Sequence, residues 1–267
     1  MLYFSEKLTS PEYAVDLPAL TAALQKAGVP FRLLPGASSI WMRDFTPVRT
    51  QSGRWVSFRY EPSYHETEEE IKKRTDFKAQ IAPQLKLAVT YSNINLDGGN
   101  VVFSPSRKTV LISDRVFPEN PDISKPLLVR TLEKLLEARV VIIPSLESDL
   151  TGHADGMVRF LDEDTVLGNR TDTENGLEQR IKEVLRRHGI EVQDFPFYSV
   201  GGISAEGCYL NFLETERALF LPVFGSPMDR EALKAARSLF KKEVVPVRLS
   251  KVAEDGGCLN CISWEDC

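Results

Sequence analysis

The 267-residue sequence contains few of the side chains that most often carry chemistry: three histidines and four cysteines. Three of the cysteines, Cys258, Cys261 and Cys267, lie within the last ten positions, and Cys208 lies elsewhere. Four cysteines clustered in this way in so large a chain do not form a disulfide scaffold. We therefore expect a reducing, cytoplasmic compartment.

Long apolar runs and an excess of basic residues are also missing. No stretch approaches the roughly 18 apolar residues of a membrane span, and the first residues lack the pattern of a signal peptide. The net charge of −5 argues against nucleic acid as a partner and suits a small cationic molecule. With 42% apolar and 27% charged residues the composition is that of a globular protein. No linker or composition shift interrupts the chain, so we predict one domain over residues 1–267.

Apolar periodicity predicts helices separated by short strands. At 67–81 the apolar stripe is thin, and the helix is predicted from acidic residues followed by basic ones, which suit the helix dipole. The helices are expected at about 16–27, 67–81, 124–138, 173–188 and from 226 onward. Runs of β-type residues predict strands at 101–103, 110–112, 140–143, 157–161, 218–222 and 244–247. Strands that alternate with single helices indicate an α/β fold.

Certain polar residues recur with nearly the same period as the helices. Asp44, Asp97, His153, Cys208 and Cys261 are separated by 53, 56, 55 and 53 positions. Five strand–helix units that cannot each bury their own apolar face are expected to close around a shared axis. These positions would then meet at a central active site. Coincidence is the alternative interpretation.

Two of these positions are aspartates in short motifs. Asp44 lies in SIWMRDFTPV, where a surface ion pair with the preceding arginine is the competing interpretation. Asp97 lies in NLDGGNVVF, and Asp-Gly is also a common turn dipeptide. Neither motif alone indicates a function.

His153 is the histidine most consistent with catalysis. In TGHADGMVRF it precedes Asp155 by two positions, so both side chains would face the same way in an extended segment. A buried structural imidazole is the alternative. His65, in a polar run, and His188, at a helix end, are expected at the surface.

Cys258 and Cys261 form a CxxC motif in EDGGCLNCISW. A zinc site needs two further ligands, and the sequence has no second CxxC or HxxxH. A redox dithiol usually opens a helix, whereas residues 259–264 are expected to form a strand. Cys258 is explained by an inert buried thiol, and Cys261 is the better nucleophile because it falls on the recurring spacing.

Five stretches together resemble the agmatine deiminase and bacterial peptidyl-arginine deiminase family. They are WMRDFTP, LDGGN, GHADGMVRF, GGISAEGCYLNFLETERALFLPVFGSPMDREAL and DGGCLNCISW, which run from about Trp41 to Trp264. The resemblance implies the five-bladed α/β propeller of the guanidino-modifying enzymes, the pentein fold. It also implies hydrolysis of a guanidino C–N bond to ammonia and a ureido product, with no metal or organic cofactor. The implied partner is a small cationic guanidino substrate.

The resemblance further implies a role for each matching residue. Cys261 matches the nucleophile, which forms a covalent thiouronium intermediate. His153 matches the acid and base, and Asp97 matches the carboxylate that orients the imidazole. The residues implied to bind substrate are Asp44 and Asp155, which would hold the guanidinium, Trp41, for which core packing is the alternative, and Asn211.

The chain departs from the family pattern in two places. Asp97 stands where many deiminases have Glu, and Asn260 stands where agmatine deiminases usually have His. The chain is also shorter than the agmatine deiminases. These departures leave the substrate open among agmatine, arginine, peptidyl-arginine and methylated arginine, and leave open amidino transfer to an amine. The oligomeric state is open as well.

Two other classes of function compete with this hypothesis. A catalytically silent propeller could serve as a binding module, but it has no reason to keep a thiol, an imidazole and three carboxylates together. A cysteine protease or amidase could use Cys261 and His153. In that enzyme the carboxylates of Asp44 and Asp155 would repel an acyl oxyanion.

Overall fold

The computed structural model describes residues 1–145, 149–170 and 176–266. By their internal contacts these residues form two compact units. Unit 1 comprises residues 1–43, 169–171 and 194–267, and unit 2 comprises residues 44–168 and 172–193. The prediction of one domain over the whole chain stays a prediction.

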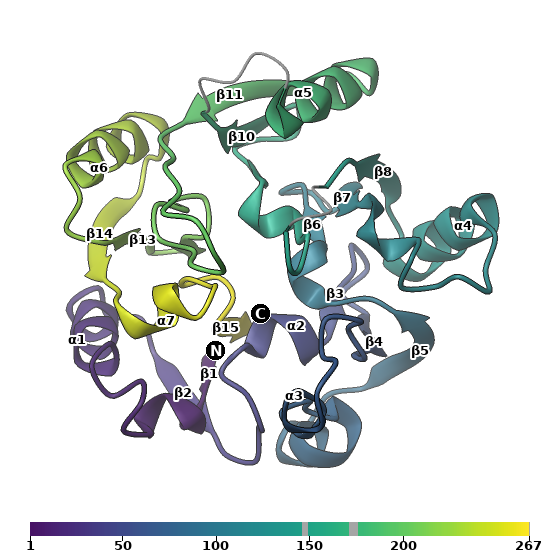
Figure 1. Cartoon of the computed structure of the whole chain (residues 1–267), viewed down its shortest axis with the longest axis horizontal. Helices are drawn as coiled ribbons and strands as arrows, with labels where there is room; N and C mark the ends of the chain where they lie inside the picture. Colours follow the sequence, from purple (N-terminus) through teal and green to yellow (C-terminus); the bar gives the residue numbers. More distant parts are fainter. Residues whose placement is uncertain (146–148, 171–175, 267) are drawn as a thin grey trace. The chain divides into compact units, whose positions relative to one another are not determined.

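The strands form five separate three-stranded sheets (Figure 1). Two of them lie in unit 1. One consists of β15 (Ser263–Glu265), β1 (Leu2–Ser5) and β2 (Phe31–Leu34). The other consists of β12 (Leu213–Glu214), β13 (Ala218–Val223) and β14 (Glu243–Arg248). Two others lie in unit 2. One consists of β3 (Val48–Arg49), β4 (Trp55–Arg59) and β5 (Val89–Asn95). The other consists of β6 (Val102–Phe103), β7 (Thr109–Ser113) and β8 (Arg139–Ile143). The last, β9 (Val158–Phe160), β10 (Thr165–Asn169) and β11 (Glu191–Phe195), belongs mainly to unit 2.

Four of the sheets repeat one connection pattern. The middle strand pairs antiparallel with one neighbour and parallel with the other, as β7 does with β6 and β8. The same pattern holds for the sheets centred on β1, β4 and β13. A parallel pair requires a crossover, and a helix supplies it between β7 and β8. Each hairpin and crossover together form one repeat, which accounts for the period of about 55 residues.

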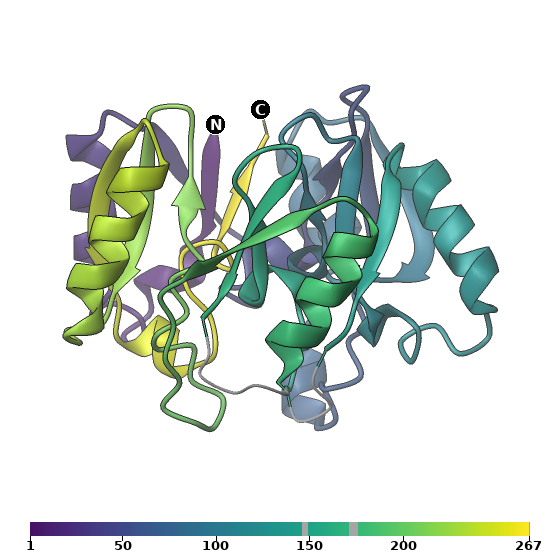
Figure 2. The ribbon, with the colours of Figure 1, turned by 90° about the horizontal axis from the view of Figure 1, so that it is seen from above.

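Four long helices begin and end close to the predicted positions. They are α1 (Leu17–Lys26), α4 (Lys125–Leu136), α5 (Leu177–Arg187) and α6 (Met228–Leu239). The first residues of the predicted helix 173–188 lie outside the described residues. Figure 2 shows α6 running alongside the strands of its sheet. In α6 the fully buried side chains are the small ones of Ala232 and Ala236.

The predicted helix at 67–81 is wrong. The structure has only the short helix α3 (Glu68–Lys72) there, followed by a π turn at Phe77–Ile81. Helix α3 buries none of its residues, so its support is local: a capping box in which Thr67 and Glu70 bond each other, and an exposed ion pair between Glu68 and Lys72. The Asp76 side chain then caps the following turn, because its Oδ1 accepts the backbone N–H of Ala79.

The core of unit 2 packs two of these helices onto their sheets. Leu128, Leu132 and Leu136 recur every four residues on α4 and are fully buried against residues of β7 and β8. Ile181 and Leu185 of α5 pack in a second cluster with Val158 and Val166. Pro126 in the first turn of α4 and the left-handed Glu137 after it define the ends of that helix.

The remaining features are short. All six predicted strands are present, as parts of β6, β7, β8, β9, β13 and β14. Two further helices, α2 (Met42–Phe45) and α7 (Lys251–Glu254), are single turns. None of the helices in the described ranges has the length and apolar character needed to cross a lipid bilayer.

Candidate active site

Unit 2 brings together an imidazole and the predicted carboxylates. Nε2 of His153 lies 2.9 Å from Oδ2 of Asp97, and Nδ1 lies 3.6 Å from Oδ1 of Asp44. Asp155 is close enough to act electrostatically on both His153 and Asp44. All four side chains are buried, with at most 8% of each residue exposed. The spacing in the sequence thus correctly placed Asp44, Asp97 and His153 in one cluster, and the convergence of Cys208 and Cys261 with them stays a prediction.

Short turns, rather than extended strands, position these side chains. Asp97 and His153 each immediately precede a single 3-10 turn, at Gly98–Asn100 and Ala154–Gly156. The extended segment expected for His153 and Asp155 is therefore wrong, because Asp155 lies inside the turn. Asn100 holds the two turns together, since its Oδ1 accepts hydrogen bonds from the backbone N–H groups of Ser113 and Ala154.

Gly99 fits into the narrow space beside the imidazole. Its backbone N–H donates to Oδ1 of Asp44 at 3.2 Å. A Cβ at this position would lie 2.6 Å from Nδ1 of His153 and 2.7 Å from Oδ1 of Asp44. The second glycine of the LDGGN motif is thus required by the approach of these two side chains.

The buried charges change the protonation of the cluster. Burial raises the pKa of Asp44 to about 7; Asp97 and Asp155 add to this, while His153 and the Gly99 N–H oppose it. Burial would lower the pKa of His153, but the carboxylates of Asp44 and Asp97 outweigh it and raise that pKa to about 10. The cluster therefore holds a proton on the imidazole at neutral pH and has an unusually basic carboxylate next to it.

Unit 1 holds Cys261 in a turn that is anchored by Asn211. Oδ1 of the buried Asn211 accepts the backbone N–H of both Asn260 and Cys261, at 3.1 and 3.2 Å. The carbonyl of Cys261 accepts the N–H of Arg43. The strand expected at 259–264 is wrong for residues 259–262, because β15 begins only at Ser263. Whether Asn211 also binds substrate stays a prediction.

Trp41 also belongs to this part of unit 1. A Cβ on Gly257 would collide with the Trp41 ring and approach the Cβ of Cys261, so the three residues are immediate neighbours. Cys261 is partly exposed, whereas Cys208 and Cys258 are buried and Sγ of Cys258 faces the carbonyl of Ala205. Cys267 lies outside the described residues. Partial exposure is consistent with a reactive thiol, and burial with an inert one.

Some residues near the cluster could not be predicted from the sequence. The Tyr64 hydroxyl donates to Oδ2 of Asp97 at 2.8 Å.

His65 is half-buried between the rings of Tyr60 and Tyr64, so its predicted surface position is only partly correct. His188 is exposed at the end of α5, as predicted. Within the described ranges, no three His, Cys, Asp or Glu side chains are grouped as metal ligands.

The sequence matches the family model for Porphyromonas-type peptidyl-arginine deiminase over residues 18–266. The chain belongs to this family. The match spans both units and contains every residue of the buried cluster as well as Cys261. No curated protein matches this peptidyl-arginine deiminase family member by sequence.

Solved structures of related enzymes share the fold of this family member. Agmatine deiminase of Enterococcus faecalis is 18% identical with a TM-score of 0.77, covering 98% of this chain and 92% of that one. Agmatine deiminase of C. jejuni is 17% identical with a TM-score of 0.75 and the same coverage. DDAH from Pseudomonas aeruginosa is 17% identical with a TM-score of 0.59, covering 98% and 97%. This likeness confirms the predicted α/β fold class, and closure of the five sheets around one axis stays a prediction.

Proposed function

We propose that this chain hydrolyses a C–N bond of a small guanidino compound, with agmatine as the lead substrate. The observation that carries the proposal is the imidazole of His153 beside the buried carboxylates of Asp97 and Asp44, in a member of a deiminase family. A cytoplasmic location, expected from the cysteine content, belongs to the same proposal.

The proposed binding residues are Asp44 and Asp155. A guanidinium group is a flat cation whose N–H groups pair bidentately with carboxylates. Burial has raised the pKa of Asp44 to about 7, so a bound cation would favour its ionised form. Two carboxylates would also keep the guanidinium protonated, and its central carbon electrophilic. Trp41 and Asn211 are the further residues proposed to contact substrate.

The proposed chemistry begins at the sulfur of Cys261. The thiolate attacks the guanidino carbon and forms a C–S bond. The C–N bond then breaks, and His153 protonates the departing nitrogen, which leaves as ammonia. His153 next removes a proton from water, whose oxygen attacks the thiouronium carbon. The C–S bond breaks, the hydroxyl of the adduct gives its proton to solvent, where ammonia becomes ammonium, and the ureido product leaves as the thiolate is restored.

The two nitrogens of His153 have different roles in this scheme. Nε2 is held by Asp97 at 2.9 Å, which fixes the ring and keeps a proton on that side. Nδ1 lies 3.6 Å from Asp44, beyond normal hydrogen-bond distance. We therefore assign the proton transfers to Nδ1. Protonation of the imidazole at neutral pH suits its first task as an acid.

Peptidyl-arginine is the second candidate substrate, because the family model carries that name. Agmatine is preferred because two of the solved structures with the same fold are described as agmatine deiminases. Free arginine and methylated arginine are alternative substrates, and amidino transfer to an added amine is the alternative reaction.

The test offers agmatine, arginine, a blocked peptidyl-arginine and methylated arginine, and measures ammonia and ureido product. We expect agmatine to turn over fastest, with one ammonia per ureido group. Cys261→Ser should abolish turnover, whereas the buried Cys258→Ser should keep most of it. Turnover of none of the four compounds would support the non-catalytic alternative. Activity that survives Cys261→Ser would exclude the covalent scheme.

A further inference from the structure

Tyr64 contacts the same carboxylate oxygen that holds the imidazole. Its hydroxyl donates to Oδ2 of Asp97 at 2.8 Å, and that oxygen lies 2.9 Å from Nε2 of His153. The rings of Tyr64 and His153 also meet edge to face, with centroids 6.3 Å apart. One oxygen atom is thus fixed from two sides, by the phenol and by the imidazole.

We propose that Tyr64 is a positioning residue for the acid and base chemistry of His153, acting through Asp97. The inference rests on the proposed function. The hydroxyl prevents the short Asp97 side chain from rotating, so the carboxylate keeps one oxygen directed at Nε2. By donating a hydrogen bond it also reduces the negative charge available to the imidazole. The ring must lose a proton before it can activate water, and a less strongly held proton makes that step easier.

The hydroxyl is suited to this task because it stays protonated. Burial, and after it the charge of Asp97, raise the pKa of Tyr64 well above its usual range. Tyr64 is therefore a permanent neutral donor over the range in which the enzyme is expected to work. A lysine or arginine at this position would instead add a charge to the cluster.

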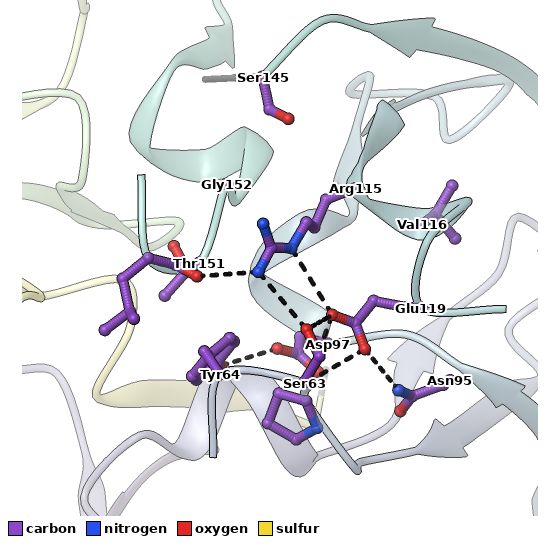
Figure 3. Close-up of polar contacts among 12 residues, drawn as sticks. Ser63, Tyr64, Asn95, Asp97, Arg115, Val116, Glu119, Ser145, Thr151 and Gly152 are labelled. Carbon is purple, nitrogen blue, oxygen red and sulfur yellow. Dashed lines mark hydrogen bonds and ion pairs between the residues drawn. The ribbon is translucent and has the colours of Figure 1, made fainter. Parts of the chain in front are cut away.

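The loop that carries Tyr64 is fastened to the body of unit 2 (Figure 3). Glu119 accepts the backbone N–H and the hydroxyl of Ser63, and also accepts the side-chain amide of Asn95. The side-chain amide of Asn95 in turn makes two hydrogen bonds with the backbone of Glu61: its Oδ1 accepts from the N–H, and its Nδ2 donates to the carbonyl. These bonds fix the segment that immediately precedes the tyrosine.

Several charged groups surround the imidazole and must be considered with Tyr64. Asp44 faces Nδ1, Asp97 faces Nε2, and Asp155 acts on the ring at longer range. Arg115 and Glu119 line the same small cavity as Asp97 and His153, and they form an ion pair at 3.6 Å in which their charges largely cancel. Loss of the Tyr64 hydroxyl would leave all of these charges in place. It would therefore change the hydrogen bonding of Asp97 without changing the net charge.

The test is Tyr64→Phe, which keeps the ring and removes the hydroxyl. We expect kcat for the best guanidino substrate to fall about tenfold while KM stays within twofold, because the group acts on proton transfer and not on binding. In the substrate-free protein, the Nε2 proton resonance of His153 should shift, and the pKa of the imidazole should rise. With three histidines in the chain, NMR signals of selectively labelled imidazoles can be assigned by single substitutions.

Tyr3→Phe is the matched control. The buried Tyr3 also donates its hydroxyl to an aspartate, Oδ2 of Asp266 at 2.7 Å, but in unit 1 and outside the proposed machinery. It should leave kcat and the His153 signals unchanged. An unaltered imidazole resonance together with wild-type kcat in Tyr64→Phe would overturn the inference. If the wild-type protein hydrolyses no guanidino compound, the proposed function fails, and the NMR arm still decides whether Tyr64 controls His153.

Discussion

Nδ1 of His153 lies 3.6 Å from Oδ1 of Asp44, and Gly99 fills the space beside both atoms. The separation is too long for a hydrogen bond, so the proton on Nδ1 is attracted by the carboxylate without being bound to it. An acid that must release its proton to a leaving group benefits from such an arrangement. Gly99 maintains it, because its N–H bonds Asp44 while its missing side chain leaves the imidazole room.

Gly99→Ala should therefore abolish most activity. The added Cβ would lie 2.6 Å from Nδ1 of His153 and 2.7 Å from Oδ1 of Asp44, so both catalytic side chains must move. We expect kcat/KM to fall at least about a hundredfold, because small displacements of reacting groups have large effects on rate. The control is Gly156→Ala, whose Cβ would meet no atom within 4 Å. If Gly99→Ala were as active as Gly156→Ala, the described packing of the cluster would be wrong.

Substrate affinity should increase with pH. Burial raises the pKa of Asp44 to about 7, so the carboxyl is largely protonated at pH 6 and largely ionised at pH 8. Only the ionised form pairs with a guanidinium, and the substrate cation stays charged over this range. We expect the Kd of substrate for the inactive Cys261→Ser variant, measured by calorimetry, to decrease severalfold from pH 6 to pH 8. Asp44→Asn should bind weakly and without this trend, and an equal pH trend in both proteins would contradict the assignment.

The sequence predicted the secondary structure best where a local pattern coincides with burial. Leucines every four residues define α4, and short β-branched runs define β7 and β8. The helix at 67–81 failed because charges favourable to a helix dipole were read as a helix although no apolar face supports one. The strand expected around Cys261 failed because the turn is held by Asn211, which lies 50 positions away.

The site was predictable in part for a related reason. Asp97 and His153 each precede a 3-10 turn, and Asp44 lies in the short helix α2 one period earlier, so their regular spacing indicated that they meet. Tyr64 has no such equivalent, and its polar surroundings resemble an ordinary surface loop. Its position depends on Glu119, which lies 56 residues from Ser63 and carries no local signature. Contacts of this kind are set by tertiary packing and cannot be derived from periodicity.

Asn100→Ala should weaken both the fold and the site. Its Oδ1 accepts the backbone N–H groups of Ser113 and Ala154, and the substitution leaves both donors buried without that acceptor. We expect the free energy of unfolding to fall by about 1–3 kcal/mol, and kcat to fall because the turn after His153 loses its support. Ser113→Ala is the control, since its buried Oγ has no hydrogen-bond partner among the described residues. That variant should be as stable as the wild type in urea unfolding.

Asn211 should support the reactivity of Cys261 in two ways, through its carbonyl oxygen as an acceptor and through the neutrality of its side chain. Oδ1 accepts the N–H groups of Asn260 and Cys261, and Asn211→Ala removes both bonds. Asn211→Asp keeps an acceptor at the same place, so the turn should retain its conformation, but the added negative charge should raise the pKa of the thiol. We expect the alanine variant to unfold more easily and the aspartate variant to remain folded while iodoacetamide alkylates Cys261 about tenfold more slowly at pH 7. A folded alanine variant with an unchanged alkylation rate would show that the turn holds the thiol without Asn211.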